Sequence, residues 1–235
     1  MDKNSNSYTF MYASVMVIVV AGILSFAAIS LKPAQQKNIE TEKKQNILAS
    51  VQIEASAEEA AQIYSERIVN TYVVNARGER TAGDAFTLDI KKEHSKPLDQ
   101  RLLPVFECQI DGSTKYILPL YGTGLWGPIW GYISLESDMN TIYGATFDHE
   151  KETPGLGAEI ATPAFQQQFR GKSIFDDKGE ICSVIVAKSN ETAPETHKVD
   201  AISGGTITSK GLQNMLLNDF NAYQAFFKQK IKEHE

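Results

Sequence analysis

Residues 8–31 form an uninterrupted apolar stretch, which constrains this 235-residue chain more than any other feature. From Tyr8 to Leu31 the chain has 24 residues without a charge, and most are Val, Ile, Ala or Met. As a helix rising about 1.5 Å per residue they would extend roughly 36 Å, enough to cross the hydrocarbon core of a bilayer with some tilt. A cleaved signal peptide is the alternative, but its apolar region is usually shorter and ends at an A-x-A-like site. We predict an uncleaved transmembrane helix over 8–31, after a short tail over 1–7.

The charges around this stretch give conflicting indications about orientation. Lys32, Lys37, Lys43 and Lys44 follow it, whereas Lys3 precedes it. The positive-inside rule alone would therefore place the large C-terminal part in the cytoplasm. The formal net charge of −6 also lies after the apolar stretch, because the charges of residues 2 and 3 cancel. An acidic domain of this kind argues against nucleic acid as a partner.

The residues typical of metal and nucleophile chemistry do not form recognisable motifs. Cys108 and Cys182 lie far apart without a C-x-x-C pair, so one disulfide and two buried thiols both remain open. The four histidines are scattered, and no zinc or iron–sulfur spacing is present. No G-x-S-x-G or similar nucleophile signature occurs. We predict neither a metal site nor a catalytic side chain.

The rest of the chain predicts a polar stalk over 32–55 and one α+β domain over 56–235. The domain begins with a helix that starts at Ser56 and runs through Ile68, with acidic residues in its first turn. β-branched and aromatic runs bounded by turn residues then predict short strands, mainly antiparallel. These strands cover Thr71–Val74, Phe106–Ile110, Lys115–Tyr121, Trp130–Glu136 and Thr141–Phe147, the last two forming a hairpin around residues 137–140.

Two helices and one further strand complete the predicted domain. Thr162–Arg170 reads as a short helix with Pro163 at its first position. Ile181–Ala187 is almost uniformly apolar and predicts a central strand. The last helix is predicted to be capped by Thr208 or Ser209 and to present one continuous apolar face made of Leu212, Leu216, Phe220, Tyr223 and Phe227.

The stretch that precedes this last helix has the composition of a phosphate-binding turn. Gly204 and Gly205 allow positive φ and a close approach of the backbone to a ligand. Ser203, Thr206 and Thr208 offer hydroxyls, and the helix start supplies free N–H groups and a partial positive charge. The spacing does not fit a Walker loop. The alternative reading is a glycine turn with Ser and Thr capping the helix, and these residues alone leave both open.

Three blocks of sequence carry a resemblance to a known family. Residues 200–208, Asp-Ala-Ile-Ser-Gly-Gly-Thr-Ile-Thr, resemble the D-x-x-S/T-G-A-T flavinylation motif, with Gly205 where Ala is usual. Residues 152–157, Glu-Thr-Pro-Gly-Leu-Gly, and the block 121–132 resemble further signatures of the same FMN-binding domain. The resemblance covers nearly the whole chain. It is to the NqrC family of the Na⁺-translocating NADH:quinone reductases, whose nearest relative is the RnfG protein of the Rnf electron-transport complex.

The resemblance implies a covalently bound FMN, joined through a phosphoester to Thr206. It implies that Ser203, Gly204, Gly205 and Thr208 surround the FMN phosphate. It places a second set beside the isoalloxazine, namely Thr153, Gly155, Leu156 and Gly157. Asp200 is expected to serve recognition by a flavin transferase. Trp126 and Trp130 could flank the flavin, but core or partner-interface packing is the expected role for both.

The resemblance also implies an electron carrier in a membrane-bound complex. The chain is expected to relay electrons from NADH towards quinone together with other subunits, and the whole complex would couple this to Na⁺ export. It implies a single-pass protein of the bacterial inner membrane with a periplasmic flavin domain, against the lysine count. Two alternatives remain, the RnfG protein of the Rnf complex and a membrane-anchored sensor or adaptor that binds FMN without a covalent bond.

Overall fold

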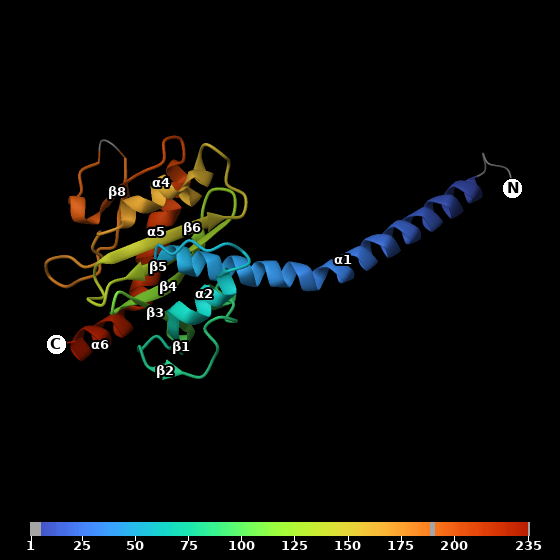
Figure 1. Cartoon of the computed structure of the whole chain (residues 1–235). Helices are drawn as coiled ribbons and strands as arrows, with labels where there is room; N and C mark the ends of the chain where they lie inside the picture. Colours follow the sequence, from blue (N-terminus) through green and yellow to red (C-terminus); the bar gives the residue numbers. More distant parts are fainter. Residues whose placement is uncertain (1–5, 189–190, 235) are drawn as a thin grey trace. The chain divides into compact units, whose positions relative to one another are not determined.

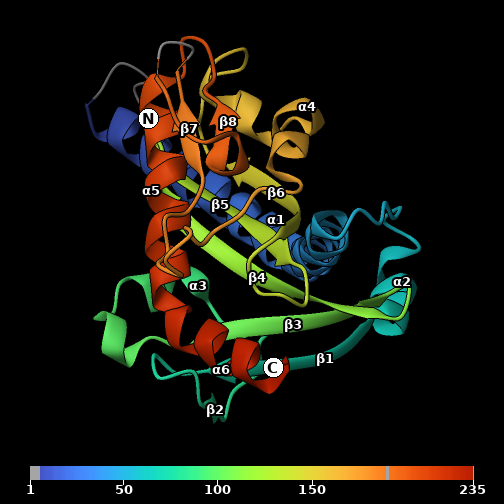
Figure 2. The ribbon, with the colours of Figure 1, turned by 90° about the vertical axis from the view of Figure 1, so that its left-hand side faces the viewer.

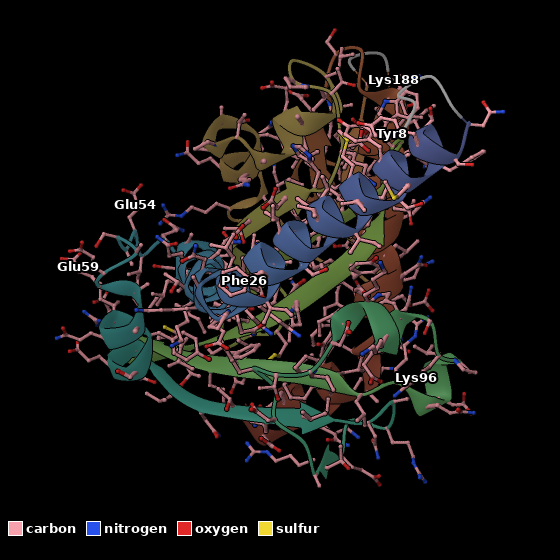
Figure 3. All side chains as sticks on the ribbon, turned by 90° about the vertical axis from the view of Figure 1, so that its right-hand side faces the viewer. Tyr8, Phe26, Glu54, Glu59, Lys96 and Lys188 are labelled. Carbon is pink, nitrogen blue, oxygen red and sulfur yellow. The ribbon has the colours of Figure 1, made fainter. Side chains whose placement is uncertain are left out.

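The computed structural model describes residues 6–188 and 191–234, in two compact units, Met1–Lys43 and Lys44–Glu235. Helix α1 (Asn6–Ser50) starts in the first unit and ends in the second. Its N-terminal part is long and apolar enough to cross a membrane, and none of that apolar window is buried. Phe26 is one of the side chains that project from α1, with 75% of its surface exposed (Figure 3). These properties fit a single-pass anchor over 8–31.

The second unit is a mainly antiparallel sheet domain with flanking helices, which confirms the predicted fold class (Figure 1). Its six-stranded sheet has the order β2-β1-β3-β4-β5-β6, and β7 and β8 form a separate parallel pair. The strands are β1 (Ile68–Val74), β2 (Arg80–Thr81), β3 (Leu103–Ile110), β4 (Ser113–Thr123), β5 (Pro128–Leu135), β6 (Ile142–His149), β7 (Ile185–Ala187) and β8 (Lys198–Asp200). The helices are α2 (Ala60–Arg67), α3 (Ile90–His94), α4 (Pro163–Gln166), α5 (Thr206–Ala222) and α6 (Gln224–His234). Short 3₁₀ turns cover Leu98–Gln100, Gly157–Ala161, Gln167–Phe169 and Glu195–His197.

The sheet carries a hydrophobic core on each face because its side chains alternate along every strand. On β4, Leu118 and Leu120 belong to one core and Ile117 to the other, and all three are fully or almost fully buried. Helices α5 and α6 cover the first face, where α5 crosses the strands (Figure 2). The other core contains Ile47 and Val51 at and just beyond the end of α1.

The C-terminal turn of α1 is built into the domain. Ile47 and Leu48 are completely buried. The hydroxyl of Ser134 on β5 donates to the carbonyl oxygen of Ser50 at 2.6 Å, which satisfies a helix-end acceptor that has no partner within the helix. The compact unit therefore begins at Lys44, inside the segment 32–55 that the sequence assigned to a stalk.

The predicted antiparallel strands are present, with small differences at their ends. The β5–β6 hairpin pairs Ile129 with His149 and turns through residues 136–141, where Asp138 accepts the N–H groups of Asn140 and Thr141. The helix predicted from Ser56 begins at Ala60. Its predicted end was wrong, because Ile68 is the first residue of β1 and pairs with Cys108.

The prediction of a central strand over Ile181–Ala187 was wrong. Only Ile185–Ala187 is a strand, β7, and it pairs with β8 outside the six-stranded sheet. Ser183 has a φ of +61°, and the N–H groups of Cys182 and Ser183 both donate to the carbonyl of Ile174, so the chain here is irregular. Val184 and Val186 are buried in the layer that covers the sheet. The apolar run therefore predicted burial correctly but predicted strand geometry incorrectly.

The predicted single C-terminal helix is two helices, α5 and α6, which meet at Tyr223. The apolar face nevertheless continues across the break, because Leu212, Leu216, Phe220, Tyr223 and Phe227 are all buried in one core. Tyr223 also donates its buried hydroxyl to the carbonyl of Pro104 at 2.7 Å. The α5–α6 pair is thus fixed to the start of β3.

Both cysteines are free thiols with different surroundings. Cys108 on β3 is fully buried, and burial raises the pKa of its thiol to about 11. Cys182 is partly exposed. We expect a maleimide at pH 7 to label Cys182 and to leave Cys108 unmodified until the protein is unfolded, because the reactive thiolate is scarce and shielded at Cys108. Mass spectrometry of labelled peptides measures this, and equal labelling of both thiols in the folded protein would contradict it.

Gly211, within α5, lies directly against the end of β4. A Cβ at this position would be 2.3 Å from the carbonyl oxygen of Thr123. Glycine to alanine in an exposed helix usually stabilises by up to about 1 kcal/mol, but here the methyl group would push α5 from the sheet. We expect Gly211→Ala to lower the free energy of unfolding by about 1–3 kcal/mol. Thermal unfolding of the full-length protein in detergent measures this, with exposed Asn214→Ala as the neutral control.

Candidate functional site

The predicted phosphate-binding turn forms the entrance to α5. Gly204 has a φ of +75°, and the first helical hydrogen bond runs from the Ser209 N–H to the Gly205 carbonyl. Helix α5 thus begins at Thr206, so the prediction that Thr208 or Ser209 caps it was wrong; Gly205 occupies the cap position. The N–H groups of residues 206–208 have no acceptor within the helix. Thr206 is exposed at this positive helix end.

A cavity of about 220 Å³ lies beside this turn. Three segments line it: the loop after β4, the turn that follows β6, and the first turn of α5. Its lining residues are Leu125, Trp126, Glu152, Thr153, Leu156, Gly157, Gly204, Gly205, Thr206, Ile207 and Thr208. The three resembling blocks of sequence therefore meet at one place in the fold.

The rim of this cavity, which we call the apolar rim, consists of Leu125, Trp126, Leu156 and Ile207. Their exposed fractions are 47%, 63%, 41% and 58%. In the described part of the sheet domain, only Val69 and Leu98 are comparably exposed large apolar side chains. Clustering of exposed apolar surface in this way is typical of a binding site.

Thr206 also borders a second, smaller cavity of about 160 Å³. Lys188 and Lys210 line it together with Glu191 and the buried first-turn residue Ser209. The hydroxyl of Ser209 accepts the N–H of Ile202 at 3.1 Å. The exposed hydroxyl of Thr206 thus lies between an apolar cavity and one with two lysines.

A buried carboxylate lines the cavity of about 220 Å³ that lies beside Thr206. Glu152 is only 4% exposed. Its Oε1 accepts the backbone N–H of Trp126 at 2.8 Å, and its Oε2 accepts the hydroxyl of Thr208 at 2.6 Å. The hydroxyl of Thr208, predicted to face a phosphate, is therefore buried and committed to Glu152.

Not every predicted site residue lines the cavity of about 220 Å³. Ser203 and Gly155 are exposed just outside it, and Gly155 has a φ of +75° that shapes the turn. Asp200 is exposed on β8, where its N–H donates to Gln168 at 2.8 Å. At Gly205, an added Cβ would lie 2.9 Å from Cγ2 and 3.1 Å from Cβ of Ile202, so an alanine here would require Ile202 to shift, although the φ of −100° suits any residue. The glycine in place of the usual alanine therefore matches the close packing of Ile202 against this turn.

Sequence reasoning missed part of the site. Trp126 is exposed at the cavity rim, so core packing, one of its two expected roles, was wrong, and packing at a partner interface stays a prediction; Trp130 is partly buried on β5. Leu125 and Ile207 were not singled out. A signal was available for both residues. Leu125 follows a glycine in a loop, and Ile207 follows Thr206 at a helix start; both are places where side chains are usually exposed to solvent.

Another cavity, of about 830 Å³, lies elsewhere, between α3, the end of β4 and α5. Close to it, the Nε2 of His94 lies 2.5 Å from a carboxylate oxygen of Asp219. No group of three or more His, Cys, Asp or Glu side chains in the described ranges is arranged to hold a metal ion.

Comparison with known proteins places this site in a family. Residues 124–219, which include the whole cavity lining, match the family described as FMN-binding domain. The NqrC protein of the Na⁺-translocating NADH-quinone reductase of Neisseria meningitidis is 34% identical, over 90% of this chain and 88% of that protein. The corresponding protein of Yersinia pestis is 31% identical, over 91% of this chain and 88% of that protein. The chain belongs to the NqrC family of Na⁺-translocating NADH-quinone reductases.

A solved structure of the same family supports this assignment. The crystal structure of the NqrC protein from Parabacteroides distasonis is 47% identical, with a TM-score of 0.79, and the match covers 84% of this chain and 96% of that one. Members of the NqrC family belong to an oxidoreductase complex. The cavity beside Thr206 thus lies in the FMN-binding domain of a reductase subunit.

Proposed function

We propose that this chain carries FMN on the hydroxyl of Thr206 and relays electrons from NADH towards quinone within a complex that exports Na⁺. The observation that carries the proposal is the apolar rim, which stands directly beside an exposed threonine hydroxyl at a helix start. Bound FMN supplies the redox chemistry, because its ring accepts and releases electrons. The protein's part is to hold the cofactor and to leave it accessible to partners.

The two sides of Thr206 suit the two ends of FMN. The apolar rim offers flat, exposed surface to an aromatic ring, with the Trp126 indole as its largest member. On the phosphate side, the free N–H groups of α5, its positive end, and the side chains of Lys188 and Lys210 would stabilise a phosphodiester anion. A tether would prevent loss of a cofactor that must stay exposed.

Formation of the ester can be written with its atoms balanced. The Thr206 oxygen forms a bond to the phosphorus of a flavin dinucleotide, the pyrophosphate P–O bond breaks, and the nucleotide monophosphate leaves. The threonine proton is released to solvent. We assign catalysis of this step to a flavin transferase, because Glu152, the carboxylate that lines the cavity, already accepts a hydrogen bond on each oxygen. Exposed Asp200 is the element we propose for its recognition.

A peptide experiment tests the proposal. Trypsin cleavage after Lys198 and Lys210 releases residues 199–210, which contain Thr206. After co-expression with a flavin transferase and denaturation, this peptide is expected to fluoresce and to carry the mass of FMN less one water, located on Thr206 by fragmentation. An unmodified peptide from fully matured protein would overturn the covalent assignment.

The membrane orientation is a separate prediction. We propose a periplasmic flavin domain, because in a complex of several membrane subunits other spans can determine the orientation, whereas the four lysines after the apolar stretch give only a modest opposite bias. A protease added to intact spheroplasts is expected to degrade the domain. Complete protection, with degradation only after lysis, would place the domain in the cytoplasm instead.

A further inference from the structure

We propose that Glu152 is the positioning residue of the flavin pocket, and that its charge adjusts the redox potential of the cofactor. This inference rests on the proposed function, since it concerns the cavity beside Thr206. No ligand contact by Glu152 is required. Its role is to join two segments that line the cavity and to place a fixed negative charge behind them.

The two oxygens of Glu152 join the segments. Oε1 accepts the N–H of Trp126, which fixes the loop that carries Leu125 and Trp126 of the apolar rim. Oε2 accepts the hydroxyl of Thr208, two residues after Thr206 in the first turn of α5. The aromatic side of the pocket and the attachment point are therefore held at a set separation by one side chain.

Two glycines leave the space that this carboxylate occupies. A Cβ at Gly124 would lie 2.4 Å from Oε1, and a Cβ at Gly157 would lie 2.2 Å from Oε2. A Cβ at Gly157 would also be 2.5 Å from the Thr208 hydroxyl oxygen. The absence of a side chain at Gly157 thus makes room for Glu152 and Thr208. Both loops are shaped around the carboxylate.

The surroundings suit an ionised carboxylate. Each oxygen accepts a hydrogen bond from a neutral donor, and the carboxylate lies at the positive end of α5. Burial keeps its field poorly screened by solvent. A negative charge beside the cavity opposes the addition of electrons to a cofactor bound there. It therefore holds the potential of that cofactor lower than a neutral side chain would.

Glutamine separates the geometric role from the electrostatic one. In Glu152→Gln the amide oxygen can still accept the Trp126 N–H, and the amide nitrogen can donate to the Thr208 oxygen. Shape is kept and charge is lost. Glu152→Ala removes both hydrogen bonds and the charge. Glu150→Gln is the matched control, because Glu150 is an exposed carboxylate two residues away that pairs with Lys151 and lines no part of the cavity.

The experiment measures flavin content and potential together. Full-length variants are co-expressed with the flavin transferase, the fluorescence of the denatured band is normalised to protein, and the midpoint potential is titrated in the native protein. Glu152→Gln is expected to keep flavin within about twofold of the original protein and to shift the potential to more positive values. In Glu152→Ala the flavin content is expected to fall at least about fivefold. Glu150→Gln should match the original protein in both.

Several outcomes would overturn the inference. They are an unchanged potential in Glu152→Gln, or full flavin content in Glu152→Ala. If Glu152→Ala fails to accumulate, Thr208→Val removes one of the two bonds and is expected to lower flavin content; undiminished content would equally overturn it. A failure of the proposed function looks different, because the unsubstituted chain would then carry no covalent flavin at all.

Discussion

Replacing Thr206 with valine is expected to abolish covalent flavin on this chain. Valine has nearly the shape of threonine and can occupy the first position of α5, but it lacks the oxygen that the phosphoester requires. Because Thr206 is exposed, the substitution leaves no buried polar group unpaired, and the fold is expected to stay intact. In-gel fluorescence of the denatured protein, after co-expression with a flavin transferase, should fall to background.

Two further variants show whether the oxygen of Thr206 is the attachment point. Thr206→Ser keeps a hydroxyl at the same backbone position and should retain fluorescence. Ser203→Ala removes the neighbouring exposed hydroxyl, which lies outside the cavity, and should also retain it. A fluorescent Thr206→Val band, or a non-fluorescent Ser203→Ala band, would indicate that the ester is on a hydroxyl other than that of Thr206. Unfolding curves of the three variants serve to check that the fold is unchanged.

Much of the fold could be predicted because local patterns and tertiary packing agree. The β4–β6 strands are runs rich in β-branched and aromatic residues and are bounded by turn residues, so they could be recognised although both of their faces are largely buried. The run Ile181–Ala187 has a similar composition, and its prediction failed because a short apolar segment indicates burial without distinguishing a strand from irregular chain. Nothing local indicates that Ser183 adopts a positive φ there. The break at Tyr223 was missed for a similar reason, since the apolar face continues through it.

The turn of the candidate site could be predicted from the sequence, but the long-range contacts that hold the turn in place could not. Glycines and hydroxyls at a helix start indicate a phosphate site from local sequence alone. The link between Glu152 and Thr208 joins residues 56 positions apart, and no local pattern reveals such a contact. For the same reason the exposure of Trp126 could not be predicted: tryptophan is usually buried, and only the assembled loops leave this one at a cavity rim.

Replacing Asp219 with alanine is expected to destabilise the domain by about 3–5 kcal/mol, because it breaks a buried polar pair. Asp219 is 2% exposed on α5. One oxygen lies 2.5 Å from Nε2 of His94, and the other accepts the N–H of Tyr121 on β4 at 3.0 Å. Burial raises the pKa of Asp219, and the hydrogen bond with His94 is the strongest influence that lowers it. Alanine would leave the Tyr121 N–H and the imidazole without their acceptor.

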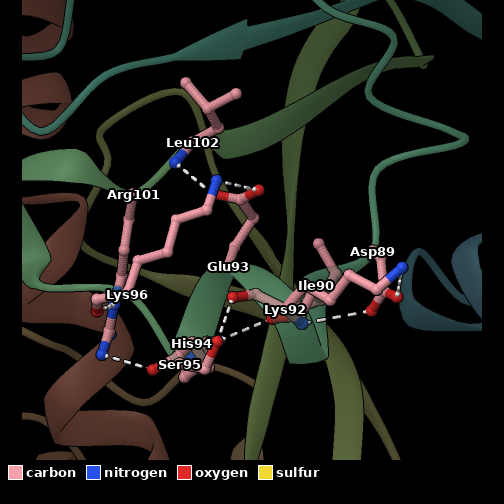
Figure 4. Close-up of polar contacts among 9 residues, drawn as sticks. All are labelled: Asp89, Ile90, Lys92, Glu93, His94, Ser95, Lys96, Arg101 and Leu102. Carbon is pink, nitrogen blue, oxygen red and sulfur yellow. Dashed lines mark hydrogen bonds and ion pairs between the residues drawn. The ribbon is translucent and has the colours of Figure 1, made fainter.

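The contact between His94 and Asp219 links the segment around α3 to α5. Within the segment, Glu93 accepts hydrogen bonds from Lys96 and from the N–H of Leu102, and Arg101 donates to the carbonyl of His94 at 2.9 Å (Figure 4). These bonds shape the segment, whereas His94 connects it to Asp219 on α5. Loss of that connection should therefore release residues 90–101 from the helix while their internal bonds remain.

Urea unfolding of the full-length protein in detergent measures the effect of Asp219→Ala. Asp219→Asn keeps an acceptor for the Tyr121 N–H and should cost less than alanine, about 1–2 kcal/mol. Asn218→Ala, at the adjacent exposed position of α5, should change the free energy of unfolding by no more than about 0.5 kcal/mol. If Asp219→Ala lowered the free energy of unfolding no more than Asn218→Ala, the buried pair of His94 and Asp219 would contribute no more to stability than a surface contact. Faster amide exchange over residues 90–101 in Asp219→Ala should accompany the loss, because the connection to α5 is gone.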